Sequence, residues 1–592
     1  MGSSIFFDAH FDAIVEQALK FYHCPGLSIA VVHKGTTYAK GYGFANIESK
    51  TPVIPETLFY TGSTTKSFTA AAYSIIASEP SKYGVVDWST PISHITPEDF
   101  VLADEWATNH VTVKDALSHR TGYPGCDKAY GQVGTHMKET IRLLRHLPMI
   151  AEPRVEWRYQ NIMYIAVSNA IERVTGMWLG DFLRQNIWTP LDMASTFFTL
   201  EHALQYVKAS KGHKAQLATG YRWVAADEYG CRFLTGDTQA GHFVEEPYMD
   251  LSHVSGAGTM ISSVVDYAKY LHCMLQQSEP IPPLGHRALR QAHTLINSEL
   301  FPTVSDQPPI RIGQPSYTLG WFHEIYARGG GGPVEIYHHP GGLYGFRTEM
   351  VYVPKLELGI ITLGNGAPTA TQVGQLLVYE IVDNLLGIDR SARFDLKREH
   401  IAQEEALLKT LPLQISRKRL FGPFTGRVRP LRISMQDHAG KYSNAGYGEV
   451  TISVRSRDAN YRLAELRDSA GQVADHFLRL TPSPRTWRWA ADLTHVSDEW
   501  FLASLVNSYP PLEFKQNPDR YQYGDEGVLE TRVRAVFKLE PQGGVRRLGI
   551  ELEPDVADAE EAKQRRGKGD KRKDGVWDWD VEKGMIWFER ID

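Results

Sequence analysis

A serine and a lysine stand three residues apart at the start of a long apolar stretch, in F-Y-T-G-S-T-T-K-S-F-T-A-A-A-Y. Residues i and i+3 share one face of a helix, so Lys66 is expected one turn along from Ser63. An amine within hydrogen-bond reach turns the weak serine hydroxyl into an effective nucleophile. The pattern S-x-x-K by itself is common, and Ser63 also fits a plain helix N-cap. Its meaning therefore depends on motifs further along the chain.

Two further segments place polar residues beside apolar runs. The first is Y-Q-N at 159–161, just before a helical pattern, and the second is H-P-G-G at 339–342, leading into a strand-like run. A phenol near an ammonium group is easier to deprotonate, and a buried amine is easier to deprotonate as well. Lys66 and Tyr159 are therefore both candidate bases for a serine, and the sequence leaves the choice open.

The order S-x-x-K, Y-x-N and H-x-G resembles the serine β-lactamase and penicillin-binding protein superfamily. Two connecting segments, A-L-S-H-R-T-G-Y-P and S-G-A-G-T-M-I-S-S-V-V-D-Y-A, also resemble segments of that family. H-x-G in place of K-T-G is similar to class C β-lactamase-like hydrolases of the D-aminopeptidase and family VIII esterase type. The resemblance covers roughly residues 10–390. It implies an α+β fold in which an antiparallel sheet is flanked by a helical subdomain.

The resemblance also implies a role for each motif residue. Ser63, Lys66 and Tyr159 are the expected catalytic residues, and the backbone N–H groups of Ser63 and Gly342 are expected to form the oxyanion hole. The residues expected to bind substrate are Asn161, His339, Gly341, Trp321 and Tyr344.

Several of these assignments carry alternatives. His339 is expected either to hydrogen-bond Tyr159 or to bind a substrate carboxylate. Trp321 and Tyr344 flank the motifs, and core packing is an equally weighted alternative for both. The adjacent His338 is expected on the opposite face of its strand, in a structural role.

Local patterns predict the elements that position these motifs. A helix is expected over 8–22, strands over 26–34 and 37–45, and a helix over 371–387. These patterns alone suggest one mixed sheet built from distant chain segments, with helices packed on it. The Gly- and aromatic-rich segment 210–260 reads as a loop or lid region.

The composition changes near residue 388 and indicates further domains. We expect a catalytic domain over 1–390, a charged linker over 391–425, and an all-β domain over 426–592 with short alternating strands typical of a barrel or sandwich. A second Y-S-N, at 442–444, lies in this last domain and resembles the start of a lipocalin-like C-terminal domain. The basic run at 563–573 is interpreted as a solvated hairpin loop.

Composition limits the function classes. The net charge of −6 gives no electrostatic case for binding nucleic acid or an anionic membrane. No stretch approaches the ~20 apolar residues of a membrane span, and the first residues lack a signal-peptide pattern, so a cytoplasmic protein is expected. Four scattered cysteines predict buried free thiols rather than a metal site or a disulfide framework.

The expected function is that of a serine hydrolase acting through an acyl-enzyme on an ester or amide, of the carboxylesterase or D-specific peptidase and amidase type. Its substrate is expected to be a small molecule or short peptide, with no cofactor. An acyltransferase of small-molecule biosynthesis that uses the same Ser–Lys–Tyr site is the alternative. A non-catalytic sensor or scaffold is a third hypothesis, which the intact Ser63, Lys66, Tyr159 and Asn161 disfavour.

Overall fold

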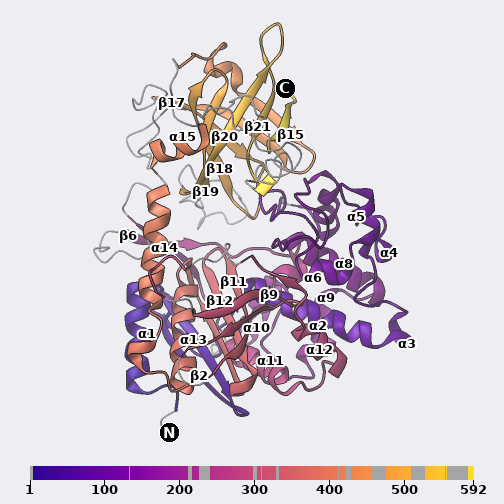
Figure 1. Ribbon diagram of the computed structural model, residues 1–592, viewed down its shortest axis with the longest axis vertical. Coiled ribbons are helices and arrows are strands. Elements are labelled where there is room, and N and C mark those ends of the chain that lie inside the picture. Colours follow the sequence, from indigo (N-terminus) through magenta and orange to yellow (C-terminus); the bar gives the residue numbers. More distant parts are fainter. Residues whose placement is uncertain are drawn as a thin grey trace.

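The computed structural model describes residues 5–132, 134–210, 216–225, 241–297, 303–307, 310–328, 332–410, 412–421, 428–456, 475–508, 527–553, 555–556 and 584–592. Two bodies follow one another along the long axis of the molecule (Figure 1). The larger body holds the N-terminus and the smaller one the C-terminus. The predicted loop at 563–573 and Cys231 lie outside the described residues.

A nine-stranded sheet forms the centre of the larger body, in the order β3-β2-β1-β13-β12-β11-β10-β9-β8. The paired strands run antiparallel throughout, which confirms the implied antiparallel sheet and shows that the mixed sheet suggested by local patterns is wrong. The strands are β1 (Gly26–His33), β2 (Thr36–Asn46), β3 (Thr51–Pro52), β8 (Thr294–Leu295), β9 (Arg311–Tyr317), β10 (Phe322–Tyr326), β11 (Val334–Leu343), β12 (Phe346–Val353) and β13 (Leu358–Gly364).

Helices cover both faces of this sheet, which explains why β1 reads as an unbroken apolar run rather than an alternating one. Ile29 and Val31 belong to a core shared with α1 (Ala9–Phe21) and α13 (Ala370–Leu385). Ala30 and Val32 belong to the core on the other side, with α11 (Val264–Gln276). The helices predicted over 8–22 and 371–387 are thus confirmed within a few residues.

A helical subdomain surrounds α2 (Thr65–Ser78), whose residues from Thr65 to Ile76 are all buried. A helix that is buried on every side needs partners all round it. These come from helices gathered on one side of the sheet (Figure 1). The remaining helices of the larger body are α3 (Pro80–Tyr83), α4 (Ile92–Ile95), α5 (Glu105–His110), α6 (Val113–Leu117), α7 (Met137–Arg142), α8 (Asn161–Thr175), α9 (Leu179–Leu183), α10 (Leu200–Ala209) and α12 (Pro283–Arg290).

Short strands and 3₁₀ turns complete the larger body. The turn η1 (Gly62–Thr64) leads directly into α2. The short strands are β4 (Phe59–Tyr60), β5 (Gly220–Ala225), β6 (Gly241–Glu246), β7 (Ile261–Ser262) and β14 (Gly366–Ala367). Strands β5 and β6 fall within the predicted loop or lid region, so its described part contains regular structure.

The segment expected to be a linker contains two helices, α14 (Leu396–Thr410) and α15 (Leu413–Phe421). Helix α14 runs beside the larger body towards the smaller one (Figure 1). It is anchored through His400, whose Nδ1 lies 2.9 Å from the hydroxyl of Tyr22 at the end of α1.

The C-terminal body is a separate closed barrel of eight strands in chain order, β15 to β22, with β22 paired back to β15. Apolar side chains such as Ile452, Leu480 and Leu493 fill its core. The all-β domain was predicted as a barrel or sandwich, and the barrel is confirmed. Its strands are β15 (Gly440–Asn444), β16 (Gly448–Ser456), β17 (His476–Pro482), β18 (Trp489–Ser497), β19 (Trp500–Ser508), β20 (Gly527–Leu539), β21 (Val545–Ile550) and β22 (Ile586–Arg590).

Two further expectations concern the whole chain. Cys24, Cys126 and Cys273 are buried free thiols, as predicted. In the described ranges, none of the helices combines the length and the apolar composition needed to cross a membrane.

The barrel is attached to the larger body by a buried arginine at the start of its β17–β18 connection. Arg485 is fully buried, and its guanidinium donates to the carbonyl of Lys128 at 2.6 Å and to that of Tyr447 at 3.2 Å. The next residue, Thr486, donates its backbone N–H to Gly131 at 2.7 Å. Because one side chain hydrogen-bonds both bodies, it fixes the connection that follows it.

We expect Arg485→Ala to lower the free energy of unfolding by about 2–4 kcal/mol, since buried carbonyls would lose their donor. Arg429→Ala is the matched control, because the Arg429 side chain is 73% exposed and should contribute less than about 1 kcal/mol. Thermal and urea unfolding compare the variants. Equal losses for both would contradict the role given to Arg485.

Candidate active site

Ser63 lies where β4 ends and α2 begins, within the turn η1. The preceding Gly62 has a positive φ of 55°, and a Cβ atom there would stand 2.7 Å from the backbone nitrogen of Gly342. Only glycine tolerates both conditions. This close approach places the backbone of the serine turn directly against the H-P-G-G segment.

Lys66 is fully buried beside Ser63. Its Nζ lies 3.0 Å from Ser63 Oγ, which confirms that the two residues share one helix face. The same amine donates to Asn161 Oδ1 at 2.7 Å and to the carbonyl of Ala257 at 2.6 Å. Burial lowers the pKa of Lys66 to about 7, while the charge of Asp127 acts in the opposite direction.

Tyr159 flanks the same amine, since Lys66 Nζ stands 4.8 Å from the centroid of its ring. Burial raises the pKa of Tyr159 well above its usual value, although a hydrogen bond with Ser63 opposes the shift. The phenol is therefore neutral at neutral pH. Its ring packs against His119, with the ring centroids 4.3 Å apart.

Asn161 is the first residue of α8 and hydrogen-bonds on both sides of its amide. While Oδ1 accepts from Lys66, Nδ2 donates to Asp127 Oδ1 at 2.9 Å. Asp127 is exposed and lines the same cavity as Ser63. Nothing in the local sequence singled out Asp127, because an acid in a Gly- and Pro-containing loop is ordinary.

The H-P-G-G segment lies on β11. A Cβ atom at Gly341 would stand 2.1 Å from the carbonyl oxygen of Thr61, so this residue must be glycine for the strand to meet the serine turn. Gly342 is exposed in the cavity. The two glycines thus lie where an oxyanion hole with Ser63 was expected.

His339 makes a different contact from the one expected. Its Nε2 lies 2.9 Å from the hydroxyl of Tyr317 and its Nδ1 lies 2.7 Å from the Pro340 carbonyl, so its hydrogen bond goes to Tyr317 rather than to Tyr159. Burial and the nearby Lys66 hold its pKa well below the usual value. A neutral ring that is 1% exposed is poorly suited to bind a carboxylate directly.

His338 points to the opposite face of β11, as predicted. It lies 3.4 Å from Glu324 and 3.3 Å from Glu349. These carboxylates raise the pKa of His338 to about 9, against the effect of burial. It is a structural ion-pair residue.

The two aromatic residues that flank the motifs, Trp321 and Tyr344, lie in different surroundings. Trp321 is fully buried and packs edge-on against Tyr352, with the ring centroids 4.9 Å apart. We therefore correct its assignment from substrate binding to the core. Its neighbour Phe322 lines the cavity, as does Tyr344.

A cavity of about 670 Å³ opens beside Ser63 and is bounded by both bodies. The larger body contributes the motif residues, with Asp127, Lys128 and Arg222 among others. The barrel contributes Trp487, Arg488, Trp489, Asn507 and Glu530. No sequence pattern pointed to these barrel residues, because they are brought to the site only by the docking of the two bodies.

Ion pairs cross the junction at the cavity wall. Lys128 Nζ lies 2.7 Å from Glu530 of the barrel. On another side, the buried Glu246 pairs with Arg222 at 2.8 Å and with Arg488 of the barrel. A network of charges that is buried and mutually paired holds the wall in one geometry.

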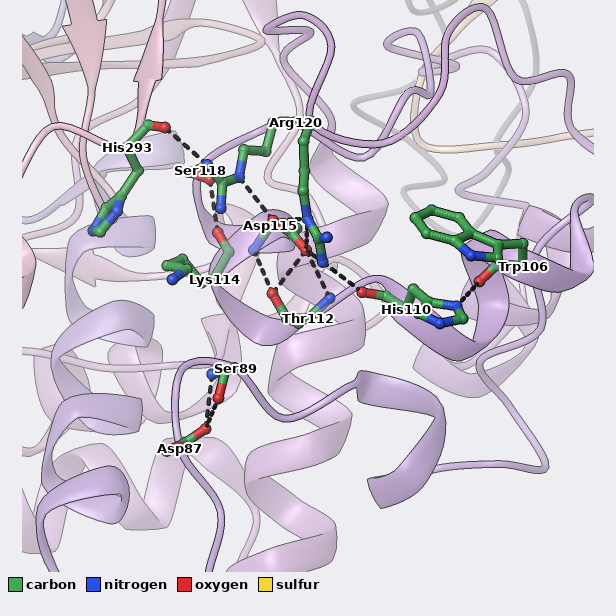
Figure 2. A network of polar contacts seen from close by, with 11 residues as sticks. Asp87, Ser89, Trp106, His110, Thr112, Lys114, Asp115, Ser118, Arg120 and His293 are labelled. Atoms are coloured by element: carbon green, nitrogen blue, oxygen red, sulfur yellow. Dashed lines mark hydrogen bonds and ion pairs between the residues drawn. The ribbon is translucent and has the colours of Figure 1, made fainter.

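The loop that carries Tyr159 is held by the buried carboxylate of Asp115 (Figure 2). Asp115 forms a capping box with Thr112 at the start of α6 and binds Arg120 at 2.7 Å. Arg154 has a positive φ of 74° and pairs with Asp115 at 2.9 Å. The carbonyl of His119 then accepts from the backbone of residue 158 at 2.8 Å, one residue before Tyr159.

Comparison with known proteins shows the family of this chain. The family model described as Beta-lactamase matches residues 11–380. The chain belongs to this family. Two relatives are 32% identical: the unguisins hydrolase ungD' of Aspergillus campestris (strain IBT 28561), over 86% of this chain and 88% of the relative, and the unguisins hydrolase ungD of Aspergillus violaceofuscus (strain CBS 115571), over 92% and 88%.

Both relatives match well beyond the Beta-lactamase family segment, so the similarity includes the barrel region. Among solved structures, the octameric penicillin-binding protein homologue from Pyrococcus abyssi aligns with a TM-score of 0.50 at 19% identity, over 92% of this chain and 97% of that one. This likeness concerns the fold alone. Membership of the Beta-lactamase family and two relatives named as hydrolases support an enzyme.

The contacts of Asp115 predict the effect of placing glycine at position 154. Arg154→Gly should lower the free energy of unfolding by about 1 kcal/mol, because relief of the left-handed backbone offsets part of the lost ion pair. The Arg154 side chain is 44% exposed, which keeps that pair modest. Arg154→Ala, which loses the pair and keeps the strain, should be less stable than Arg154→Gly. Urea unfolding of the three proteins tests this order, and the reverse order would contradict it.

The buried amine predicts how stability depends on pH. Because burial lowers the pKa of Lys66 to about 7 in the folded protein, against 10.5 for an exposed lysine in the unfolded chain, the unfolded chain holds an extra proton between these limits. Stability should therefore rise by about 1.4 kcal/mol per pH unit above pH 7 through this group. Lys66→Met should lose this slope, while Lys82→Met, whose side chain is 58% exposed, should keep it. Urea unfolding from pH 7 to 9 measures the slopes, and parallel profiles for wild type and Lys66→Met would refute the assignment.

Proposed function

We propose that this protein is a serine hydrolase that forms an acyl-enzyme at Ser63 on an ester or amide. One observation carries the proposal. Two of the three neighbours of Lys66 Nζ, Asn161 Oδ1 and the Ala257 carbonyl, accept hydrogen bonds only. A neutral amine gives them its two hydrogens, which leaves its lone pair for the hydroxyl of Ser63.

The lowered pKa of Lys66 supports this residue as the base. The amine is in part neutral at pH 7, whereas the raised pKa of Tyr159 leaves its phenol protonated. In the proposed step, Ser63 Oγ attacks the acyl carbon and its proton goes to Lys66 Nζ. The oxyanion is bound by the backbone N–H groups of Ser63 and Gly342.

Tyr159 is then placed to complete the proton transfer. Its hydroxyl gives a proton to the leaving alcohol or amine as the bond to the acyl carbon breaks, and it recovers a proton from the Lys66 ammonium. Water then enters, gives a proton to Lys66 Nζ and attacks the acyl carbon. As the bond to Ser63 Oγ breaks, the Lys66 ammonium returns that proton to Oγ and the acid is released. Each group ends in its starting state, so the cycle balances.

The cavity suits a small molecule or a short peptide. Its volume of about 670 Å³ exceeds what a simple acetyl ester fills, and aromatic and charged side chains line it together. Asn161, Gly341 and Tyr344, which line the cavity, are proposed to contact the substrate, and His339 to hold the cavity wall in place through its hydrogen bond with Tyr317. The names of the two relatives make unguisins a first candidate substrate class. A D-specific amidase or peptidase and a carboxylesterase remain the reaction types of the proposal.

Acyl transfer to an alcohol or amine would use the same intermediate and differ only in the acceptor. The hydrolase names of both relatives support water as the acceptor. A sensor or scaffold would not require Lys66 to be desolvated at a cost of several kcal/mol. The hydrolase proposal therefore accounts for more of the site.

The decisive experiment is turnover of p-nitrophenyl acetate and butyrate, and labelling by a fluorophosphonate, followed by intact-mass spectrometry. We expect a single adduct on the wild type, and a loss of turnover by more than about 10⁴-fold in Ser63→Ala. Since the base must be neutral, the rate should rise with pH through about 7.

Ser67→Ala is the matched control on the same helix, because Ser67 is buried and donates to the Thr64 carbonyl at 2.9 Å, away from Lys66. This variant should retain the adduct. An adduct that persists in Ser63→Ala, or a wild type that neither turns over nor is labelled, would overturn the proposal.

A further inference from the structure

Asp127 is a carboxylate that the family motifs do not include, and it lies one hydrogen bond from Asn161. Its Oδ1 accepts from Asn161 Nδ2 at 2.9 Å and from the hydroxyl of Tyr130 at 2.8 Å. Together with the Lys66 contacts, this forms a continuous chain from Ser63 through Lys66 and Asn161 to Asp127, with distances of 3.0, 2.7 and 2.9 Å.

We propose that Asp127 is a positioning residue, which fixes the side-chain amide of Asn161 so that its oxygen faces Lys66. This inference rests on the proposed function, since Asn161 holds Lys66, the proposed base for Ser63. Asp127 itself need not touch the reacting atoms, because it acts through Asn161.

The side-chain amide of Asn161 has two possible orientations. In the observed orientation, the Asn161 oxygen faces an N–H donor and its NH₂ faces a carboxylate, which can only accept. Rotating the amide by 180° would set NH₂ against the Lys66 amine and oxygen against the Asp127 carboxylate. The contact between the amide oxygen and the carboxylate would become repulsive, so the carboxylate disfavours the rotated form.

The orientation of Asn161 matters because it decides where the Lys66 lone pair points. A neutral amine needs two acceptors other than Ser63 to direct both hydrogens away from it, and Asn161 Oδ1 is one of these two. If the amide rotated, the lone pair of Lys66 would be drawn towards the Asn161 NH₂ instead. Ser63 would then lose its base.

Asp127 also acts on Lys66 by charge. The other titratable groups around this amine are Tyr159, Tyr164, His119 and His339. The pKa values of the two tyrosines are raised, and those of the two histidines are lowered, all by burial, so these four are neutral near pH 7. Among the residues that the structure describes, Asp127 is the charge that raises the pKa of Lys66, against the effect of burial.

Two variants of the full-length protein separate the geometric and the charge effects. Asp127→Asn keeps an oxygen that accepts from Asn161 and Tyr130 but removes the charge. Asp127→Leu removes both. The readout is the rate of labelling of Ser63 by a fluorophosphonate from pH 5 to pH 9, which needs no knowledge of the natural substrate.

For Asp127→Asn we expect the acidic limb of the labelling profile to move to lower pH by about one unit, with the plateau rate within about threefold of wild type. For Asp127→Leu we expect the plateau rate to fall by about 10- to 100-fold, since the amide is no longer held. Asp192→Asn is the matched control, because it removes a carboxylate that is 90% exposed and does not line the cavity. It should leave the limb in place.

The outcomes distinguish this inference from the proposed function. A wild type that is not labelled at Ser63 would overturn the proposed function, and the inference with it. A labelled wild type whose profile is unchanged in Asp127→Asn and Asp127→Leu would overturn the inference alone. If Asp127→Leu fails to fold, judged by its thermal transition, Asp127→Ala decides, because it also removes the acceptor of Asn161: a plateau rate equal to that of the wild type overturns the inference.

Discussion

The site depends on one desolvated amine. Removing the Lys66 ammonium from water costs several kcal/mol, and the protein relieves this cost by lowering the pKa of the amine to about 7. The neutral form is the one that can take a proton from Ser63. Burial is therefore at once a penalty in stability and the source of reactivity, a combination that active sites use repeatedly.

Much of the larger body serves to keep that amine dry and its neighbours fixed. Helix α2 is buried on every side, and Lys66 lies behind Ser63 and Asn161, which line the cavity. The sheet brings Gly341 so close to the serine turn that a Cβ atom on it would meet the Thr61 carbonyl, and a Cβ atom on Gly62 would meet the backbone of Gly342. The same constraint explains why the turn and β11, far apart in sequence, each carry a glycine at this contact.

The sequence predicted the parts of the site that local rules govern and missed those that depend on docking. Ser63 and Lys66 share a helix face, so their contact follows from a spacing of three. Trp321 and Phe322 show the limit of such reasoning. They are adjacent, and only one of them lines the cavity, since facing alternates along an extended chain and the sequence does not reveal which face is turned to the site. The salt bridge between Lys128 and Glu530 joins residues 402 positions apart, and no periodicity encodes it.

The two bodies contribute different parts of the site. The residues around Lys66 belong to the larger body, whereas Trp487, Arg488 and Trp489 enter the cavity from the barrel at the point fixed by Arg485. Substitutions in that barrel segment would reshape the wall that meets the substrate and leave the distances among Ser63, Lys66 and Asn161 unchanged. Substitutions around Lys66 are different, because its amine needs both of its acceptors, Asn161 Oδ1 and the Ala257 carbonyl. In the proposed hydrolase, substitutions in the barrel segment can therefore change the contacts with the substrate while the groups proposed for acyl transfer stay constant.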